Sequence, residues 1–287
     1  MNSKIDVVQI SVVMATYKGE LASNLKQAVD SILTQTLAPF EFVIVGDGPL
    51  PDDQLRVIDD AVAKAAFPVR FLQLDENVGR GRARNFGIAC CTSEFIALMD
   101  SDDISLPNRL AVQAAFLQEN SGVDVSATLT EEFDEDDHPG AAAIVKTCPE
   151  SHEGIHKALR LSNCVANPTL LFRKAYWNQV GGFPDFREIN EDYLFYFRLI
   201  SAGAKFACLP VVLLRVRIGR QQRLRRKGIK ILMSDVRFRL TVYREGHLGF
   251  FWTAFPLLLI AVRRMLPPYF EKSAQAVWRR FSHTIHK

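Results

Sequence analysis

Two kinds of segment alternate along the first 120 residues, and this alternation restricts the fold more than any other feature of the sequence. Short apolar runs rich in β-branched side chains are separated by longer segments whose apolar residues recur at helical spacing. The expected strands are Gln9–Thr16, Glu41–Val45, Val69–Leu74 and Phe95–Met99, and the expected helices are Asn24–Leu33, Asp52–Lys64, Gly81–Cys90 and Leu110–Leu117. Strands joined through helices form parallel β-α-β units. We therefore expect an α/β fold with a mostly parallel sheet and flanking helices.

The pattern continues with a longer interruption in the next part of the chain. The acidic segment Thr130–Gly140 is predicted to be a loop, Glu191–Ala202 a helix and Phe206–Val216 a strand. From Arg215 onward the sequence changes abruptly to mixed basic and aromatic segments. We therefore expect an α/β domain over residues 1–215, with halves at 1–120 and 121–215, followed by basic amphipathic helices in a C-terminal region over residues 216–287.

The charges of the chain are distributed unevenly. The formal net charge is only +3, and the 48% content of hydrophobic residues is that of a folded protein. Residues 1–210 carry 18 basic and 29 acidic side chains, whereas residues 211–287 carry 17 basic and 3 acidic ones. Such an asymmetry indicates that the C-terminal region meets an anionic partner, either a nucleic acid or a phospholipid surface.

The C-terminal region also contains an apolar run, Leu248–Val262, which is 15 residues long and includes a proline. A spanning helix needs about 20 apolar residues, so this run is too short to cross a bilayer comfortably. Arg263 and Arg264 follow at once. Apolar runs flanked by arginines favour helices that lie in the headgroup region of an anionic membrane. There are two alternatives to membrane attachment. One is nucleic-acid binding through Arg220–Lys227, and the other is a buried helix that closes the domain. The long apolar run argues against the nucleic acid.

The five cysteines and the N-terminus bear on the compartment. The cysteine number is odd and none of them forms a CxxC pair, which favours a reducing environment. The first 20 residues have no apolar segment of the secretory type. We therefore expect a cytoplasmic protein, or one bound to the cytoplasmic face of a membrane.

Carboxylates follow the fourth expected strand in the segment Asp100-Ser101-Asp102-Asp103. In parallel sheets, ligands bind beyond the carboxyl ends of the strands. Three carboxylates in four residues repel one another, and a cation would relieve the repulsion. Their hard oxygen ligands suit Mg²⁺ or Mn²⁺, which are often shared with substrate phosphates. The alternative is a solvated acidic turn before the next helix.

Other polar residues follow the first three strands. Ala15 and Tyr17 lie at the end of the first strand, and Asp47 follows the second between two glycines. Arg80 and Arg84 follow the third, at a spacing that places both on one helix face, where they could neutralise a diphosphate. An aromatic ring can stack on a nucleobase, and a carboxylate can accept from a base N–H. Ordinary turn chemistry and a solvated basic face are the alternatives.

Taken in order, these motifs resemble those of family 2 glycosyltransferases with the GT-A fold. The matching segments in the nucleotide-sugar half are SVVMATYKGE, VIVGDG, NVGRGRARN and LMDSDDISLPNRL, and those in the acceptor half are NPTLLFRK, GGFPD and NEDYLFYFRL. The resemblance extends to about residue 215. More loosely, the remaining chain resembles enzymes that build bacterial capsular, lipopolysaccharide or exopolysaccharide chains, including amylovoran-type transferases.

The resemblance implies an inverting, metal-assisted, hexosyltransferase-like enzyme at the cytoplasmic face of a bacterial inner membrane. It would move a sugar from a nucleotide-diphosphate donor, a UDP-sugar, to a glycan or lipid-linked acceptor. The nucleotide-binding residues implied are Ala15, Tyr17, Asp47, Arg80, Arg84, Asp100 and Asp102, and the implied metal ligands are Asp102 and Asp103. Asp192 matches the catalytic base, with Glu191 as its neighbour.

The sequence departs from the family in three places. Gly46 replaces the first of two aspartates after the second strand, and Lys18 replaces an asparagine. Both departures concern nucleotide specificity more than the fold. The QxxRW motif of processive synthases is absent, since no tryptophan follows Gln222-Arg223. This absence favours the addition of a single sugar.

Several alternatives remain open at the level of sequence. A nucleotidyltransferase that makes sugar nucleotides could also use the carboxylates after the fourth strand, but it would not need the basic and apolar C-terminal region. Asp192 could simply complement the dipole at a helix N-terminus. The chain could be a non-catalytic nucleotide-binding relative. His152, Glu153 and His156 match the HExxH pattern of zinc metallohydrolases. That pattern needs a regular helix and a third ligand, whereas here Gly154 is expected to interrupt the helix.

Overall fold

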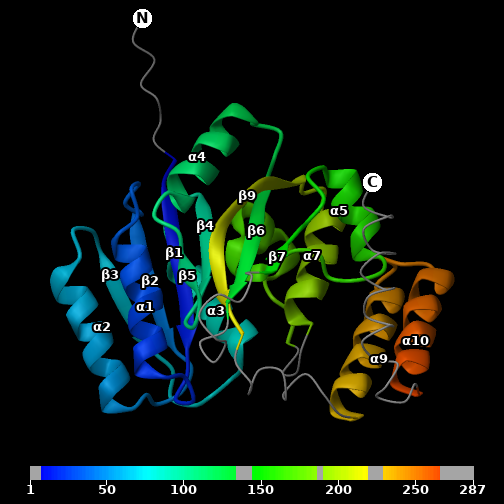
Figure 1. Ribbon diagram of the computed structural model, residues 1–287, viewed down its shortest axis with the longest axis horizontal. Coiled ribbons are helices and arrows are strands. Elements are labelled where there is room, and N and C mark those ends of the chain that lie inside the picture. Colours follow the sequence, from blue (N-terminus) through cyan, green and yellow to red (C-terminus); the bar gives the residue numbers. More distant parts are fainter. Residues whose placement is uncertain (1–7, 134–143, 186–189, 219–228, 266–287) are drawn as a thin grey trace, which may run out of the picture.

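The computed structural model describes residues 8–133, 144–185, 190–218 and 229–265 (Figure 1). The strands are β1 (Ile10–Thr16), β2 (Glu41–Gly46), β3 (Val69–Gln73), β4 (Phe95–Asp100), β5 (Ile104–Ser105), β6 (Val125–Phe133), β7 (Ile144–Lys146), β8 (Leu171–Arg173) and β9 (Phe206–Arg217). The helices are α1 (Ala22–Leu33), α2 (Asp52–Lys64), α3 (Arg80–Cys90), α4 (Arg109–Glu119), α5 (His152–Leu159), α6 (Lys174–Val180), α7 (Glu191–Ser201), α9 (Ile229–Arg244) and α10 (Phe250–Met265), with a 3₁₀ turn η1 (Asn167–Thr169).

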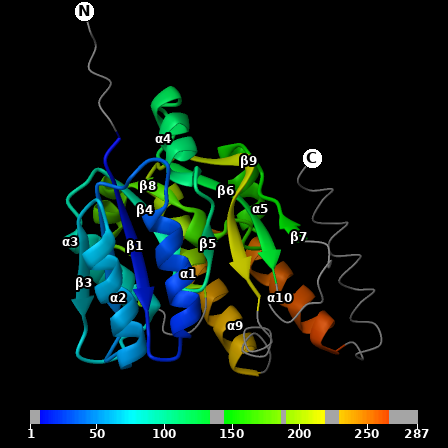
Figure 2. The ribbon, with the colours of Figure 1, turned by 60° about the vertical axis from the view of Figure 1, so that its left-hand side comes forward.

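The strands form one mixed sheet in the order β3-β2-β1-β4-β8-β6-β9-β5, with β7 paired to β6. Parallel pairing joins β3, β2, β1 and β4, and it also joins β6 to β9. The short strand β8 runs antiparallel to both β4 and β6, so β6 and β9 run in the same direction as β1. In Figure 2, the arrows of β1 and β9 point toward the same edge of the sheet. The predicted α/β fold with a mostly parallel sheet is confirmed.

Alternate residues of the strands face two separate cores. Val13, Val43 and Leu98 pack with residues of α3, α5 and α7 on one face of the sheet. Their strand neighbours Val12 and Phe42 pack with residues of α1, α2 and α4 on the other face. This arrangement, visible in Figures 1 and 2, explains why the strands are apolar throughout: both faces are covered.

The predicted loop Thr130–Gly140 was wrong over its first four residues, which belong to β6. Acidic side chains are tolerated there because each meets a basic residue of a neighbouring strand. Glu131 Oε1 lies 3.1 Å from Arg215 Nε on β9, and Glu132 Oε1 lies 3.3 Å from Lys146 Nζ on β7. The cross-strand partners were not visible in the local sequence. The rest of the predicted loop, residues 134–143, lies outside the described residues.

Gly154 does not interrupt the helix, contrary to expectation, because α5 runs through it from His152 to Leu159. Its backbone N–H donates to the Oγ of the N-cap residue Ser151 at 3.1 Å. A Cβ at position 154 would lie 2.9 Å from the Cβ of Pro149. A larger residue at position 154 would therefore collide with Pro149, which explains the glycine within this helix.

The described part of the C-terminal region packs on the α/β domain through α9. Phe238 and Val242 of α9 are buried in the same core as Tyr193 and Phe197 of α7. Helix α10 packs against α9 at the end of the molecule opposite α2 (Figure 1). Within the described residues, each helix is too short or too polar to span a membrane. The division of the chain at residue 215 stays a prediction, and residues 219–228 and 266–287 lie outside the described residues.

Candidate functional site

The predicted site residues of the N-terminal half meet at the carboxyl edge of the sheet. Ala15 of β1 is in register with Asp100 of β4, and Thr16 is in register with Gly46 of β2. Tyr17 and Asp47 directly follow these strands. The parallel register thus brings together three segments that are distant in the chain, at the edge of the sheet where the sequence predicted ligand binding.

Asp100, Asp102 and Asp103 form an acidic cluster in which one carboxylate oxygen from each residue lies within 4.8 Å of those of the other two. Asp103 is 3% exposed. Burial raises the pKa of Asp103 well above its ordinary value, and the neighbouring charges of Asp102 and Asp100 raise it further. A divalent cation would relieve this repulsion, and carboxylate oxygens are ligands that Mg²⁺ and Mn²⁺ prefer. The residues present therefore fit the predicted metal.

Arg84 links the acidic cluster to the start of α7. This arginine is 4% exposed, and its Nη2 lies 2.6 Å from Oδ1 of Asp100. Its Nη1 lies 3.4 Å from Oε1 of Glu191, a carboxylate that is 1% exposed. The Nε of Arg80, one turn earlier on α3, lies 2.5 Å from the same oxygen. Figure 1 places α3 and α7 next to the carboxyl edge of the sheet. A continuous chain of ion pairs therefore joins the cluster to the acceptor half.

The carboxylate of Glu191 is enclosed by the two arginines, whereas that of Asp192 is only half-buried. Burial, together with the neighbouring charge of Glu191, raises the pKa of Asp192 to about 6 against the opposing effect of Arg80 and Arg84. A carboxyl group with such a pKa is ionised at neutral pH, yet it is a stronger base than an exposed aspartate. Of the two predicted catalytic residues, Asp192 therefore has the properties of a general base.

Asp47 has a structural task in addition to its predicted one. Its Oδ1 accepts from the backbone N–H of Val78 at 2.7 Å, and its Oδ2 accepts from that of Gly79 at 3.1 Å. Burial raises the pKa of this carboxyl group, and the two N–H donors lower it in part. Gly79 has φ of 94°, a conformation that favours glycine. Asp47 thus fixes the turn that starts α3, and its contact with a nucleobase stays a prediction.

Two side chains at this site were not among the predicted residues. Arg217, at the end of β9, donates its backbone N–H to Oδ1 of Asp103 at 3.0 Å and its Nε to the carbonyl oxygen of Asp102 at 2.9 Å. Asn163 donates its Nδ2 to Oδ2 of Asp192 at 3.2 Å. The sequence signal for Arg217 was weak. It lies one residue beyond the expected strand Phe206–Val216, and the sequence did not show that β9 pairs with β5, next to the cluster.

The predicted zinc alternative finds little support in the geometry. His152 Nδ1 accepts from the backbone N–H of Phe206 at 3.2 Å, so this nitrogen is already occupied. The rings of His152 and His156 are tilted, with centroids 6.3 Å apart. Among the described residues, the acidic cluster is the one group of three or more potential metal ligands close enough to share an ion.

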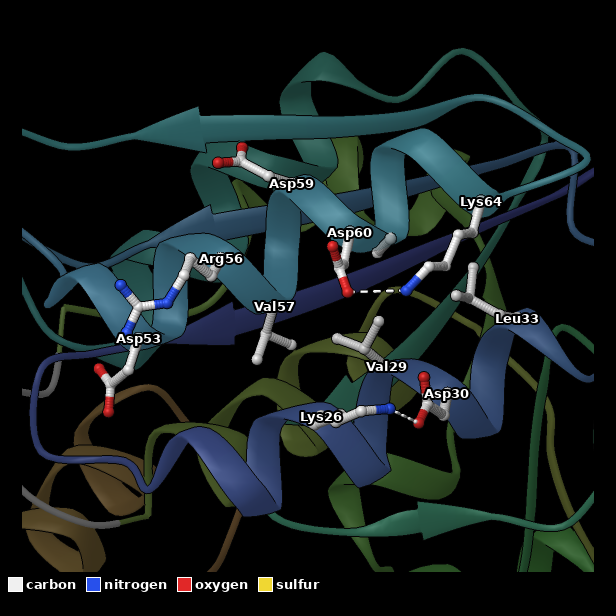
Figure 3. Close-up of a pocket in the computed structure, with 11 residues that line it drawn as sticks. Lys26, Val29, Asp30, Leu33, Asp53, Arg56, Val57, Asp59, Asp60 and Lys64 are labelled. Carbon is white, nitrogen blue, oxygen red and sulfur yellow. Dashed lines mark hydrogen bonds and ion pairs between the residues drawn. The ribbon is translucent and has the colours of Figure 1, made fainter.

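A groove of about 380 Å³ lies between α1 and α2, away from the predicted site residues (Figure 3). Apolar side chains line it, among them Val29, Leu33 and Val57. Ion pairs on its rim join Lys26 to Asp30 and Lys64 to Asp60 on the two helices. These charges are already paired within each helix. Aspartates and basic residues line the groove, but among the described residues only those of the acidic cluster lie close enough together to share a metal ion.

Comparisons with known proteins agree with the resemblance seen in the motifs. Residues 11–179 match the family described as "Glycosyl transferase family 2". The chain is 31% identical to the amylovoran biosynthesis glycosyltransferase AmsE of Erwinia amylovora, over 90% of this chain and 94% of that protein. It is 28% identical to the UDP-Gal:alpha-D-GlcNAc-diphosphoundecaprenol beta-1,3-galactosyltransferase of Escherichia coli, over 93% of this chain and 94% of that protein.

A solved structure shares the fold at lower identity. The crystal structure of S. aureus TarS 1-349 in complex with UDP-GlcNAc superposes with a TM-score of 0.63 at 20% identity, and the match covers 82% of this chain and 66% of that one. In a longer TarS structure, the match covers 39% of the chain. The same arrangement of sheet and helices thus occurs in a protein with a bound nucleotide sugar.

Proposed function

Because the chain belongs to glycosyl transferase family 2, we propose that it moves a hexose from a UDP-sugar to a glycan or lipid-linked acceptor. The observation that supports this proposal is the chain of ion pairs from Asp100 through Arg84 to Glu191, the residue that precedes Asp192. The names of the two relatives, one in amylovoran biosynthesis and one acting on a diphosphoundecaprenol acceptor, support a role in bacterial surface polysaccharide synthesis.

The donor is proposed to bind along the carboxyl edge of the sheet. Tyr17, Ala15 and Asp47 would contact the uridine, and Asp100 and Asp102 the ribose and diphosphate. Arg80, whose side chain is half-exposed, would face the diphosphate. Asp102 and Asp103 would hold Mg²⁺ or Mn²⁺, which when bound supplies positive charge beside the leaving diphosphate.

Asp192 is proposed to act on the acceptor. As the acceptor oxygen forms its bond to the anomeric carbon, the bond from that carbon to the diphosphate breaks, and the hydroxyl proton passes to the carboxylate of Asp192. Attack from the face opposite the leaving group inverts the anomeric centre. Proton transfer to a positioned base contributes typically about 10²–10⁴-fold to the rate.

The C-terminal helices are proposed to rest on the anionic surface of the inner membrane, at its cytoplasmic face. Phe250, Phe251 and Leu258 of α10 are 74%, 61% and 61% exposed, and Met233 of α9 is 66% exposed. Residues 211–287 carry 17 basic and 3 acidic side chains, a charge suited to anionic headgroups. Such a surface would bring a lipid-linked acceptor within reach of Asp192.

Binding and turnover together test the proposal. Thermal unfolding is measured with UDP-, GDP-, TDP- and CMP-sugars, each with and without Mn²⁺, because a ligand that binds only the folded state raises its stability. We expect the largest shift with a UDP-sugar and Mn²⁺, and loss of that shift in Asp102→Asn. Release of UDP in the presence of an acceptor is expected to require Asp192. If Asp102→Ala and Asp192→Ala both leave wild-type function, the chain is instead a non-catalytic relative.

A further inference from the structure

The side chain of Asp192 is held from outside its own helix. Its Oδ1 accepts from the adjacent backbone N–H of Tyr193 at 2.8 Å, and its Oδ2 accepts from Nδ2 of Asn163 at 3.2 Å. The amide of Asn163 is oriented in turn, since its Oδ1 accepts from the backbone N–H of Val165 at 3.1 Å. Asn163 lies between α5 and η1, in a segment separate from the ion pairs of Arg80 and Arg84. Its bond therefore restrains the carboxylate of Asp192 from outside α7, in addition to the bond from Tyr193.

The segment that carries Asn163 is fixed by Arg239 of α9. This arginine is 4% exposed and donates to the carbonyl oxygens of Arg160 and Leu161 at 2.8 and 2.7 Å. Its Nη2 also lies 3.4 Å from the hydroxyl oxygen of Tyr193, the residue that follows Asp192. One guanidinium thus joins the end of α5 to the start of α7, and these are the two places from which Asn163 and Asp192 project.

Helix α9 also holds the residue on the other side of Glu191-Asp192. Asn190 has φ of 77°, the one positive value among the described residues other than glycine. Its Nδ2 donates to Oδ1 of Asp235 on α9 at 3.1 Å. A side chain in this uncommon conformation persists where its surroundings hold it. The contact therefore fixes the backbone at the point where α7 begins.

We propose that Asn163 is a positioning residue for Asp192, and that α9, through Arg239 and Asp235, holds the two segments that carry this pair. The proposal rests on the function proposed above, in which Asp192 is the base. It makes α9 a part of the catalytic machinery, since the orientation of the base depends on contacts made by residues beyond the α/β domain.

Asn163→Asp tests the positioning role with little change in shape. The new carboxylate can still accept from Val165 N–H, but it cannot donate to Asp192 and it repels that carboxylate. We expect kcat to fall roughly tenfold, the scale of a lost hydrogen bond to a charged group, with the KM for the donor within about twofold of wild type. Asn120→Ala, which removes another exposed asparagine bond far from the site, is the matched control.

The pH profile provides a second readout. The charged groups acting on Asp192 are Glu191 on α7 and Arg80 and Arg84 on α3, and the Tyr196 hydroxyl on α7 is also close enough to interact. A hydrogen-bond donor to the ionised carboxylate lowers the pKa of Asp192, so loss of the bond from Asn163 is expected to raise that pKa. In Asn163→Asp the acid limb of kcat is therefore expected to move to higher pH, whereas in Asn120→Ala it stays in place.

A double-mutant cycle separates this proposal from the assignment of the base. In Asp192→Asn, Asn163→Asp is expected to cause no further loss of kcat, because there is no base left to position. Wild-type activity of Asp192→Asn would overturn the proposed base itself. An inactive Asp192→Asn together with a fully active Asn163→Asp, or full additivity of the two changes, would overturn the positioning role alone.

Arg239→Lys and Asn190→Gly test the contribution of α9. Lysine keeps the charge at 239 but cannot span both carbonyl groups and the Tyr193 hydroxyl. Glycine keeps the positive φ at 190 and removes only the bond to Asp235. We expect each change to lower kcat several-fold, without additivity to Asn163→Asp. A lower melting temperature with unchanged kcat in both variants would show that α9 is only a structural support.

Discussion

Arg84 is the residue on which the geometry of the site most depends. It is buried, and it is paired with Asp100 on the donor side and with Glu191 on the acceptor side. Burial alone would lower the pKa of Arg84, but the negative charges of these two carboxylates stabilise the protonated guanidinium and raise that pKa. A planar guanidinium can serve two partners at once, which an ammonium group does poorly.

We therefore expect Arg84→Met to leave two carboxylates without their shared cation and to lower the free energy of unfolding by about 3 kcal/mol, the usual cost of breaking a buried pair. Arg84→Lys keeps the charge and is expected to lose less stability. Urea unfolding of the two variants measures the difference. Equal stability of Arg84→Met and wild type would show that the ion pairs contribute nothing to folding.

The ionised carboxylate of Asp192 is expected to lower the free energy of unfolding at the pH values at which it can act as a base. Its pKa in the folded protein is about 6, above the ordinary value of 3.8, so the unfolded chain loses this proton first as pH rises. The protonated carboxyl group therefore adds to the free energy of unfolding below about pH 4. This contribution is lost as the pH rises to about 6, and it stays lost at higher pH.

Asp192→Asn is consequently expected to be more stable than wild type at pH 7, by about 1–2 kcal/mol after allowance for solvent screening, and equal to it near pH 4. Wild-type activity is expected to fall as pH drops through about 6, since only the ionised carboxylate accepts a proton. Denaturant unfolding at the two pH values and the pH dependence of kcat measure both effects. A variant less stable than wild type at pH 7 would contradict the prediction.

Among the described elements, α10 carries the most exposed large apolar side chain, Phe250. Phe250 and Phe251 are both more than 60% exposed at its first turn, and the rings of Phe251 and Phe255 stack with centroids 5.5 Å apart. Burying one such side chain contributes about 1.5–3 kcal/mol. A helix with these residues on its surface is typical of attachment to an interface.

Phe250→Ser with Phe251→Ser is expected to weaken binding to phosphatidylglycerol vesicles at least tenfold, since two buried rings are lost. Co-sedimentation with the vesicles measures the partition. Phe40→Ser and Phe86→Ser, which change phenylalanines that are 44% and 40% exposed elsewhere in the molecule, are the controls. Equal binding of the test variant and these controls would place the membrane contact on another surface.

At the scale of the whole molecule, the charge is divided between an acidic part and a basic part. Residues 1–210 have an excess of 11 acidic side chains and residues 211–287 an excess of 14 basic ones. Only the basic part is attracted to an anionic surface, so the molecule is expected to bind in one orientation.

Raising the salt concentration from about 0.1 M to 0.5 M is expected to release the protein from anionic vesicles, because exposed charges are screened over shorter distances. The paired carboxylates at the site are buried, so turnover with a water-soluble acceptor is expected to change little. Vesicle flotation and UDP release, measured at both salt concentrations, test the two expectations. Release from neutral vesicles over the same range would indicate a different cause.

Local patterns predicted the parts of this molecule that depend on neighbouring residues. The strands β1 to β4 and the carboxylates that follow β4 were found within one or two residues of their expected positions, because side-chain periodicity and strand ends are local properties. Arg217 and Asn163 could not be found in this way. Arg217 reaches the cluster because β9 pairs with β5. Asn163 meets Asp192 where the segment after α5 lies against the start of α7, two places that Arg239 also bonds.

The pairing of β6 with β9, a strand that comes much later in the chain, has a consequence for synthesis of the protein. The three-residue strand β8 lies between β4 and β6, and β6 is completed in turn only by β9, which ends at Arg217. While the ribosome is still adding the later residues, β6 has an unpaired edge, and open edges attract other chains. Pairing of β9 with β6 is thus expected to be the slow step of folding. A fragment that stops at residue 179, the end of the family match, would lack β9 and is expected to aggregate.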